Sequence, residues 1–303
     1  MSSLAFLFPG QGAQTVGMGR GLWSESSAAR RIIERSNEVL GYDLARICFE
    51  GPAETLDSTV HSQPALYVTS FAALETLRET RPERVAQCDI TAGLSLGEYT
   101  ALAFAGVFSF EDGLRLVRTR GEAMQAASDA NASGMVSVLG MERDALEQLC
   151  ASSRQEGEVL QIANYLCPGN IAVSGSLPAC ERLAAAAPGA GAMKAIRLAV
   201  AGAFHTPLMQ SAVKRLAAAV ASVPMQPARI PVVSNVDGKP QRDPEAIREL
   251  LLRQVVSPVL WEDSLRWIVA DGCREFCEIG SGRVLAGLLK RIDRKLAIEN
   301  VTA

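Results

Sequence analysis

The segment Gly93-Leu94-Ser95-Leu96-Gly97 constrains the fold of this 303-residue chain more than any other feature. The residues before it, Ile90-Thr91-Ala92, end a predicted buried strand, and a predicted helix over residues 98–105 follows it. Gly-x-Ser-x-Gly between a strand and a helix is typical of a nucleophile elbow, a sharp turn that exposes the serine hydroxyl above a sheet. We therefore predict an α/β fold with Ser95 as a nucleophile, an ordinary turn being the alternative.

A serine hydroxyl needs a neighbouring base before it can attack a carbonyl carbon, and histidine suits that role at neutral pH. The chain contains only two histidines. His61 precedes Ser-Gln-Pro at the predicted start of a helix, which favours a surface or capping role. His205 lies in a loop between a predicted strand and a predicted helix, where catalytic groups are common. We therefore favour His205 as the base, with a buried, fully hydrogen-bonded histidine as the alternative.

Attack on a carbonyl also requires hydrogen-bond donors for the oxyanion. The backbone N–H of Leu96, directly after the nucleophile, is the standard first donor of an elbow. The glycine loop Gly10-Gln11-Gly12 would supply a second if it lies beside the elbow. Arg120 belongs to a predicted arginine-rich helix, where most arginines are solvated. A guanidinium is nonetheless suited to binding a carboxylate through two hydrogen bonds.

Composition argues against several classes of protein. The net charge of −3 at pH 7 favours neither nucleic acid nor a membrane surface as a partner. No apolar run approaches the ~18 residues of a membrane span, and no basic stretch precedes the short apolar segment at the N-terminus, so we expect no signal peptide. The seven cysteines are scattered without a Cys-x-x-Cys pair. We therefore predict no disulfide framework, no metal site and a reducing compartment.

The predicted elements fall into two groups. Residues 128–199 show the order β-α-β-β-α-β, with strands at 135–139, 159–163, 171–173 and 195–200 and helices at 142–150 and 177–187, which is the ferredoxin-like arrangement. Strands and helices alternate in the rest of the chain, with strands at 4–8, 230–233 and 276–279 and helices at 22–40, 63–77, 209–220, 245–252 and 284–292. We predict a discontinuous large α/β domain, residues 1–127 and 200–303, that carries a small ferredoxin-like domain at 128–199.

Several segments, taken together and in order, resemble the malonyl-CoA:acyl-carrier-protein transacylase family over nearly the whole chain. These segments are Phe8–Gln14, Gly93–Tyr99, Arg120–Gln125, Ala163–Tyr165, Gly202–His205, Gln254 and Glu278–Gly282. The resemblance implies an α/β-hydrolase-like large domain with an inserted ferredoxin-like small domain. It also implies transfer of a malonyl group from malonyl-CoA to the phosphopantetheine thiol of acyl carrier protein, supplying fatty acid synthesis.

The resemblance implies roles for the residues at the reacting centre. Ser95 would be the acylated nucleophile, and His205 the general acid and base. The backbone amides of Gln11 and Leu96 would form the oxyanion hole. The backbone carbonyl of Gln254 would orient the histidine in place of the aspartate of a triad.

The resemblance also implies an acyl pocket. Arg120 would bind the free carboxylate of malonate, which reverses the solvated interpretation given above. Met124 and Phe204 match positions that shape the pocket, and a phenylalanine before the histidine is similar to malonyl-selective members of the family. Two residues depart from the family pattern, Leu94 where histidine is frequent and Ser281 where proline is usual. We expect little effect of either on the chemistry.

The implied partners are acyl carrier protein and malonyl-CoA, with no cofactor, metal, nucleic acid or membrane. We predict a monomer in a bacterial cytoplasm, or in the plastid stroma if a transit peptide has been removed. The helix near the C-terminus carries a basic cluster, which we interpret as a solvated face, with carrier docking as the alternative: Lys290, Arg291, Arg294 and Lys295. Rival functions are a trans-acting polyketide acyltransferase, a serine hydrolase or thioesterase, and a non-catalytic scaffold.

Overall fold

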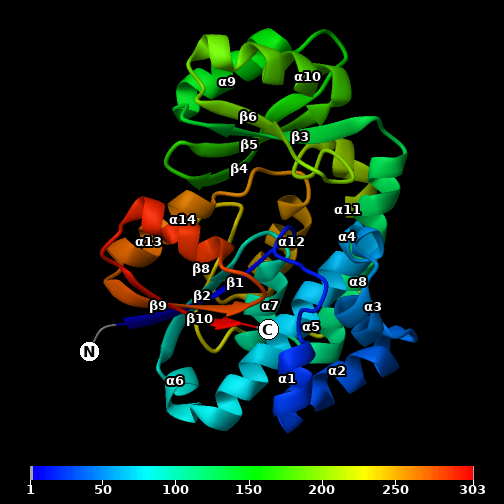
Figure 1. Cartoon of the computed structure of the whole chain (residues 1–303), viewed down its shortest axis with the longest axis vertical. Helices are drawn as coiled ribbons and strands as arrows, with labels where there is room; N and C mark the ends of the chain where they lie inside the picture. The colour runs from blue at the N-terminus through cyan, green and yellow to red at the C-terminus, as the bar shows by residue number, and fades with distance from the viewer. Residues whose placement is uncertain (1–2, 303) are drawn as a thin grey trace.

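The computed structural model describes residues 3–302 and contains two separate β-sheets, drawn in Figure 1. The larger sheet has the strand order β10-β9-β1-β2-β7-β8. Its strands run parallel except for the antiparallel pair β7–β8. Their bounds are β1 Ser3–Phe8, β2 Cys88–Gly93, β7 Val232–Val233, β8 Pro240–Gln241, β9 Cys273–Gly280 and β10 Ala297–Thr302. A parallel sheet of this kind is buried on both faces, which requires helices on each side.

Alternate side chains of β1 enter two different hydrophobic cores, because successive strand residues point to opposite faces. Leu4, Phe6 and Phe8 pack with helices on one face, and Ala5 and Leu7 pack with helices on the other. The first face is covered by α5 Thr59–Thr80, α7 Gly97–Phe104 and α8 Phe110–Asp129. The second is covered by α13 Trp261–Ala270 and α14 Val284–Ile292.

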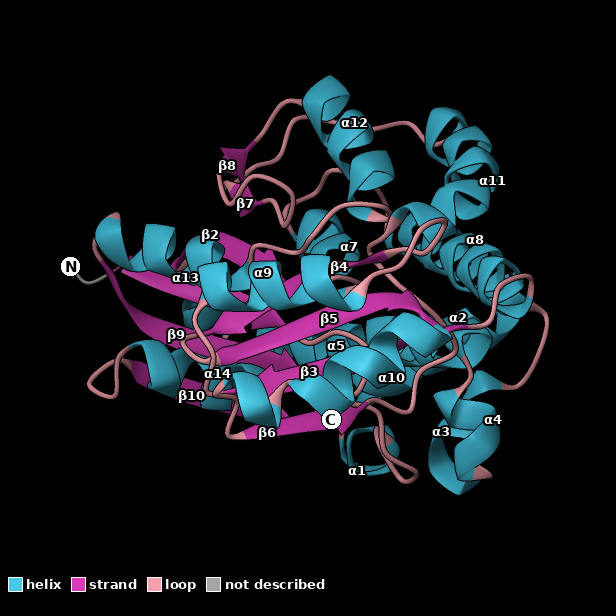
Figure 2. Cartoon of the chain, turned by 90° about the horizontal axis from the view of Figure 1, so that it is seen from above, coloured by secondary structure: helices cyan, strands magenta, loops and turns pink. Residues whose placement is uncertain are grey.

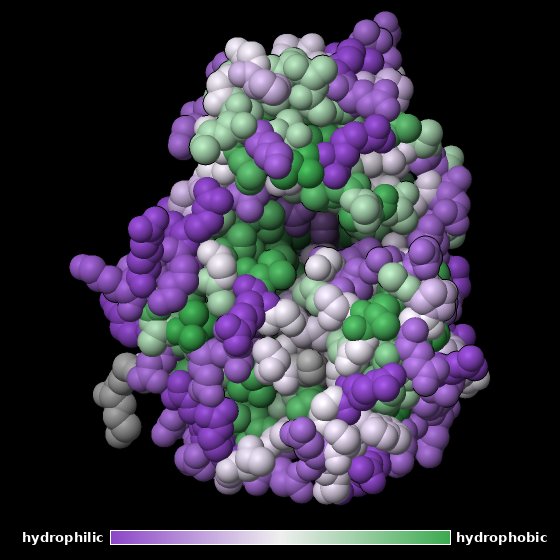
Figure 3. All heavy atoms as spheres, in the orientation of Figure 1, coloured by the Kyte–Doolittle hydropathy of each residue, from purple (hydrophilic) through white to green (hydrophobic). Residues whose placement is uncertain are grey.

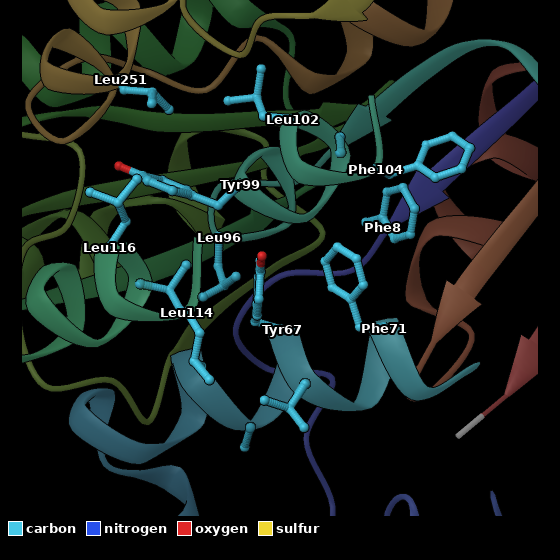
Figure 4. Close-up of a cluster of buried hydrophobic side chains, with 14 of the residues drawn as sticks. Phe8, Tyr67, Phe71, Leu96, Tyr99, Leu102, Phe104, Leu114, Leu116 and Leu251 are labelled. Carbon is cyan, nitrogen blue, oxygen red and sulfur yellow. The ribbon is translucent and has the colours of Figure 1, made fainter. Parts of the chain in front are cut away.

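The first core surrounds the turn that carries Ser95. Figure 4 shows the rings of Phe8 and Phe104 side by side, with Phe71 of α5 below them. Leu96 and Tyr99, which follow Ser95, are both buried in this cluster. The turn and the first residues of α7 are therefore fixed by packing as well as by backbone geometry.

The remaining helices beside the larger sheet pack against α5, against α8 or against one another. They are α1 Arg20–Glu25, α2 Ser27–Leu40, α3 Leu44–Glu50, α4 Ala53–Asp57, α6 Pro82–Ala86, α11 Gln210–Ser222 and α12 Pro244–Gln254, with a 3₁₀ turn η2 at Pro207–Met209. The single helix predicted at 22–40 is wrong, because Ser26 is extended and separates α1 from α2. The Ser26 hydroxyl accepts a hydrogen bond of 3.1 Å from the Ala29 N–H and caps α2.

The smaller sheet is antiparallel and has the strand order β4-β5-β3-β6. Its elements are β3 Ser133–Leu139, α9 Arg143–Ser153, β4 Leu160–Cys167, β5 Asn170–Ser176, α10 Leu177–Ala186, a 3₁₀ turn η1 at Pro188–Ala190 and β6 Lys194–Arg197. The two helices pack on one face of the sheet and form a core of their own with it. This part is the upper lobe in Figure 1, and Figure 2 shows it in front of the larger sheet.

The segments by which the chain enters and leaves the smaller sheet lie next to each other. The Leu198 N–H, just after β6, donates to the carbonyl of Met135 in β3. Strand β4 is also hydrogen-bonded to the segment that follows α12. The Tyr165 N–H donates to the Val259 carbonyl, and the Val259 N–H donates to the Ala163 carbonyl. Figure 3 shows that the surface is hollowed where the two parts meet.

Several predicted boundaries need correction. The strand predicted at 230–233 is only Val232–Val233, and the strand predicted at 195–200 ends at Arg197. Helix α14 ends at Ile292, so Arg294 and Lys295 of the basic cluster lie beyond the helix. Strand β10 and helix α13 were not predicted.

No helix among residues 3–302 is long and apolar enough to cross a membrane. The seven cysteines are all free and buried, so none is part of a disulfide in the described structure.

Candidate active site

The turn that carries Ser95 is strained and needs glycine on both sides of it. Ser95 has φ +51°, in the left-handed region that residues with a side chain rarely adopt. A Cβ at Gly93 would lie 2.0 Å from the backbone of Gly97, and a Cβ at Gly97 would lie 2.1 Å from the carbonyl oxygen of Phe8. The Leu94 N–H donates to that same carbonyl at 3.0 Å. Neither glycine position can therefore carry a side chain, because the backbones at the ends of β1 and β2 and at the start of α7 are in direct contact there.

His205 contacts the Ser95 hydroxyl through one ring nitrogen and a backbone carbonyl through the other. Its Nε2 lies 2.9 Å from Ser95 Oγ, and its Nδ1 lies 2.8 Å from the backbone carbonyl oxygen of Gln254. Because a carbonyl can only accept, Nδ1 carries the proton and Nε2 is free to accept one from the serine hydroxyl. Burial, and secondarily the charge of Arg120, lower the pKa of His205 to about 4. The imidazole is therefore neutral at physiological pH.

Arg120 is 1% exposed, so the solvated interpretation is wrong. Its guanidinium donates to Ser95 Oγ at 3.0 Å, to Gln63 Oε1 at 2.8 Å and to Gln254 Oε1 at 2.9 Å. The cation also lies 5.5 Å from the ring centroid of Tyr99. No carboxylate of the described residues forms an ion pair with it. A buried cation held only by neutral groups is costly, and an anionic ligand would offset that cost.

Two further side chains surround the turn. Asn235 Oδ1 accepts a hydrogen bond of 2.6 Å from the Ser95 N–H, and its Nδ2 donates to the Gly93 carbonyl at 2.8 Å. Glu98 Oε2 accepts from Gln254 Nε2 at 2.5 Å and from the Asn235 N–H at 3.3 Å. Burial raises the pKa of Glu98 to about 7.

Gln63, Glu98 and Asn235 were not predicted from the sequence, and for Gln254 only the role of the backbone carbonyl was. Glu98 directly follows the Gly-x-Ser-x-Gly segment, and this position was the one available signal. Asn235 lies 140 residues from Ser95, in a turn that nothing in the local pattern distinguishes.

The loop after β1 lies against the nucleophile turn. A Cβ at Gly10 would lie 2.2 Å from the carbonyl oxygen of Leu94, so the two backbones are in direct contact. Within residues 3–302, neither the N–H of Gln11 nor that of Leu96 donates to any acceptor. The structure thus places two unused amide donors on the segments that flank Ser95.

Met124 and Phe204 are buried, at 1% and 6% exposure, in the same core as the turn. Met124 lies one helical turn after Arg120 on α8, which puts both side chains on the same face of that helix. Gln63, which accepts from Arg120, also contacts the Met124 sulfur through its Nε2 at 3.7 Å. Phe204 directly precedes His205 in the chain.

The two departures from the family pattern are accommodated by packing. Leu94 is partly buried and packs against the second core. Ser281 is buried, and its hydroxyl donates to the sulfur of Met18 at 3.3 Å. The second histidine, His61, lies in the first turn of α5, where its Nδ1 is 2.9 Å from the Ser58 hydroxyl, away from the nucleophile.

Enzymes that form an acyl-serine typically place a serine at a strained turn of an α/β fold, with a neutral histidine beside it. The present site has both features, on a largely parallel sheet, and it also has unused amide donors on both sides of the serine. A family model described as an acyl transferase domain matches residues 5–299. The chain belongs to the malonyl-CoA:acyl-carrier-protein transacylase family of acyltransferases.

Individual relatives show how extensive the similarity is. A malonyl CoA-acyl carrier protein transacylase of Bacillus subtilis is 42% identical over 296 residues, which cover 98% of this chain and 92% of that protein. The acyl-carrier-protein S-malonyltransferase of Bartonella henselae superposes with a TM-score of 0.95 at 39% identity, over 99% of this chain and 95% of that one. A malonyl-transacylase solved in complex with its type II polyketide synthase acyl-carrier protein superposes with a TM-score of 0.94 at 36% identity, over 99% and 96% of the two chains.

Proposed function

We propose that this enzyme transfers a malonyl group from malonyl-CoA to the phosphopantetheine thiol of an acyl carrier protein, through a malonyl ester of Ser95. The observation that carries the proposal is the convergence of two groups on one hydroxyl. His205 Nε2 lies 2.9 Å and the guanidinium of Arg120 lies 3.0 Å from Ser95 Oγ. A base and a carboxylate-binding cation at the same oxygen suit an acyl group that carries its own carboxylate.

The mechanism follows from these positions. His205 Nε2 takes the Ser95 proton as the hydroxyl attacks the thioester carbon, and the oxyanion binds the amides of Gln11 and Leu96. Each such donor is worth about 3 kcal/mol of transition-state stabilisation. The C–S bond then breaks, His205 returns the proton to the CoA thiolate, and a malonyl-serine ester remains. The carrier thiol gives its proton to His205 and its sulfur attacks the ester carbonyl. The acyl C–O bond to Ser95 then breaks, and His205 returns the proton to the serine oxygen.

The Gln254 carbonyl, which accepts from Nδ1, serves as the group that orients the histidine in this proposal. Nδ1 thus faces a neutral backbone acceptor in place of the carboxylate that serine hydrolases of this type use. This difference favours an acyltransferase over a hydrolase or thioesterase. The intact pair of Ser95 and His205 also argues against a non-catalytic scaffold.

Arg120 gives the site its preference for carboxylated acyl groups. A malonyl carboxylate would pair with the buried guanidinium, whereas a neutral acyl chain would leave it without an anion. Met124, one helical turn after Arg120 on α8, and Phe204, which directly precedes His205, are both buried and would form the wall of the acyl pocket. A phenylalanine directly before the histidine is similar to malonyl-selective members of the family, which favours malonyl over methylmalonyl.

We expect Arg120→Ala to lower kcat/KM for malonyl-CoA by about 100-fold or more, because the substrate carboxylate loses its partner. Transfer from acetyl-CoA should fall less or improve. Arg118→Ala is the matched control, since Arg118 lies on the same helix, is 43% exposed and pairs with Glu122. An unchanged preference for malonyl over acetyl in the Arg120 variant would exclude the clamp.

We further propose that residues 128–199 form a ferredoxin-like domain inserted into an α/β-hydrolase-like domain of residues 1–127 and 200–303. The antiparallel order β4-β5-β3-β6, with two helices on one face and a separate core, supports this division. The parallel strands, with the nucleophile turn directly after β2, support the assignment of the larger part.

The acceptor is an acyl carrier protein in this proposal, as the names of the relatives suggest. A carrier of fatty acid synthesis is favoured, and the polyketide complex among the similar structures supports a polyketide carrier as the second candidate. The buried free cysteines support a reducing compartment. A monomer in the bacterial cytoplasm, or in the plastid stroma, stays a prediction.

The direct test is a time course with malonyl-CoA and a carrier protein, with and without its phosphopantetheine arm. Malonyl-carrier should form only when the arm is present, and free malonate should accumulate slowly in its absence. Fast release of malonate without any acceptor thiol would instead identify a thioesterase. Relative rates with fatty acid and polyketide carriers separate the two candidate pathways.

A further inference from the structure

The side chain of Asn235 spans the nucleophile turn. Asn235 is fully buried and lies in the loop that follows β7. Its Oδ1 accepts from the Ser95 N–H at 2.6 Å, and its Nδ2 donates to the Gly93 carbonyl at 2.8 Å. A carboxamide carries one acceptor and one donor on a single planar group, so it can bridge two backbone groups that lie on either side of Leu94.

These two hydrogen bonds satisfy backbone groups that the turn leaves without a regular partner. An unpaired buried amide or carbonyl costs about 1–3 kcal/mol. Ser95 is also in the left-handed region, a conformation that persists only when its surroundings enforce it. The orientation of the next amide, that of Leu96, depends on the backbone angles of Ser95. Asn235 therefore stabilises the conformation in which the hydroxyl and the oxyanion donor are both presented.

Asn235 is itself held by its backbone. Its N–H donates to Glu98 Oε2 at 3.3 Å, and its carbonyl accepts from the Leu260 N–H at 2.7 Å. The same oxygen of Glu98 accepts from Gln254 Nε2 at 2.5 Å, and Gln254 Oε1 accepts from Arg120. One continuous set of buried hydrogen bonds thus joins the nucleophile turn to the guanidinium.

We propose that Asn235 is a positioning residue of the acyl-transfer reaction, which holds the Ser95 turn in its reactive conformation and is fixed to the Arg120 guanidinium through Glu98 and Gln254. This inference rests on the proposed role of Ser95 as the nucleophile. It assigns to Asn235 an effect on the rate of acylation, with little effect on the binding of malonyl-CoA.

Asn235→Asp is the informative substitution because it preserves the size of the side chain. The aspartate can still accept from the Ser95 N–H, but when ionised it presents an oxygen to the Gly93 carbonyl where the amide presented an N–H. It also places a second carboxyl beside Glu98, the titratable group that contacts Asn235. His205 and Arg120 reach this position only through Ser95 and Gln254.

Asn300→Asp is the matched control. Asn300 donates to the buried Glu278 at 2.9 Å and is half-buried, so it also pairs an asparagine with a buried carboxyl. It lies on β10 and contacts none of the groups around Ser95. A loss of rate that arose only from general destabilisation would appear in both variants.

Two rates are measured for the wild type and each variant, together with the thermal unfolding midpoint. The first is the single-turnover rate of acylation by malonyl-CoA, and the second is the rate at which a fluorophosphonate probe labels Ser95. We expect Asn235→Asp to lower both rates at pH 8 by about 30-fold or more, with KM changed less than about threefold. Both rates should recover as the pH is lowered and the aspartate becomes protonated, because the acid again donates to Gly93. Asn300→Asp should leave both rates near wild type.

Wild-type rates in the Asn235→Asp protein would overturn the inference. An equal loss of rate in the Asn300→Asp protein would also overturn it, and so would a loss in Asn235→Asp that persists when the pH is lowered. The probe keeps this result separate from the proposed function. If the wild type took no malonyl group, the proposed function would fail. A slower reaction of the Asn235→Asp protein with the probe would still support the positioning role.

Discussion

His205 is held in the protonation state that a base requires. Its Nδ1 hydrogen is fixed by the Gln254 carbonyl, and burial keeps the ring neutral by lowering its pKa to about 4. A histidine at its ordinary pKa near 6.5 would lose much of its basic form in mildly acidic solution. Here the accepting nitrogen stays available well below neutral pH. The positive φ of His205, +63°, shows that the backbone is strained to place it there.

We expect the acylation rate with malonyl-CoA to change little between about pH 8 and 5.5 and to fall as the pH approaches 4, because only then does His205 gain a proton. The free energy of unfolding should also decrease as the pH falls through this range. The unfolded chain binds this proton below pH 6.5 and the folded protein does not, so the free energy of unfolding decreases as the pH falls from 6.5 toward 4. Single-turnover acylation across this range is the measurement.

Glu98→Gln is the control for that profile. Glu98 titrates in the opposite sense, since burial raises its pKa to about 7 and its proton stabilises the folded state until the pH rises through that value. The variant should keep the fall in rate near pH 4. A midpoint near pH 6.5 in both proteins would show that His205 titrates normally.

Helix α7 begins where β1 and β2 end, and its position depends on the absence of a side chain at Gly97. We expect Gly97→Ala to lower the free energy of unfolding by about 3 kcal/mol, because the new Cβ would lie 2.1 Å from the Phe8 carbonyl oxygen. Gly287→Ala is the control, since nothing lies within 4 Å of a Cβ at that position of α14. That change should stabilise by about 0.5–1 kcal/mol. Urea unfolding measures both, and equal effects would contradict the packing argument.

The sharp turn at Ser95 could be predicted because the features that define it are local. Gly93, Ser95 and Gly97 follow one buried strand and precede one helix, so a short window of sequence contains the whole signal. The predicted strands of the smaller sheet were found for the same reason, since each shows its own apolar pattern.

Long-range contacts could not be predicted in the same way. Arg120 belongs to a helix with several arginines, and only the folded structure shows that it is buried while Arg118 is exposed. Asn235 meets Ser95 across 140 residues, and Gln63 meets Arg120 across 57. Resemblance to a family indicated Arg120, but no pattern in the residues themselves distinguished Asn235 or Gln63.

The smaller sheet and its helices are joined to the rest of the molecule by backbone and side-chain contacts. Arg143 forms two hydrogen bonds of 2.9 Å with Asp263, and its guanidinium lies 4.4 Å from the ring centroid of Tyr165. Gln161 of β4 donates to the His205 carbonyl at 3.2 Å. The smaller sheet therefore contacts the loop that carries the base directly.

We expect Arg143→Ala to lower the free energy of unfolding by about 1 kcal/mol or less. Arg143 and Asp263 are both more than a third exposed, at 36% and 38%, so solvent screens their attraction. Glu262, the second acidic partner of Arg143, keeps its ion pair with Arg266 in the variant. The hydrogen bonds between β4 and the Val259 segment remain in the variant. Equilibrium urea unfolding is the measurement, and a loss above about 3 kcal/mol would show that the joint depends on this pair.

The most direct test of the account is mass spectrometry of the protein after brief exposure to malonyl-CoA. We predict that the wild type gains the mass of one malonyl group, that the group maps to the peptide containing Ser95, and that Ser95→Ala gains none. Acetyl-CoA should give little or no adduct with the wild type. A malonyl adduct on the Ser95→Ala protein, or on any other peptide of the wild type, would contradict the assignment of Ser95 as the residue that carries the acyl group.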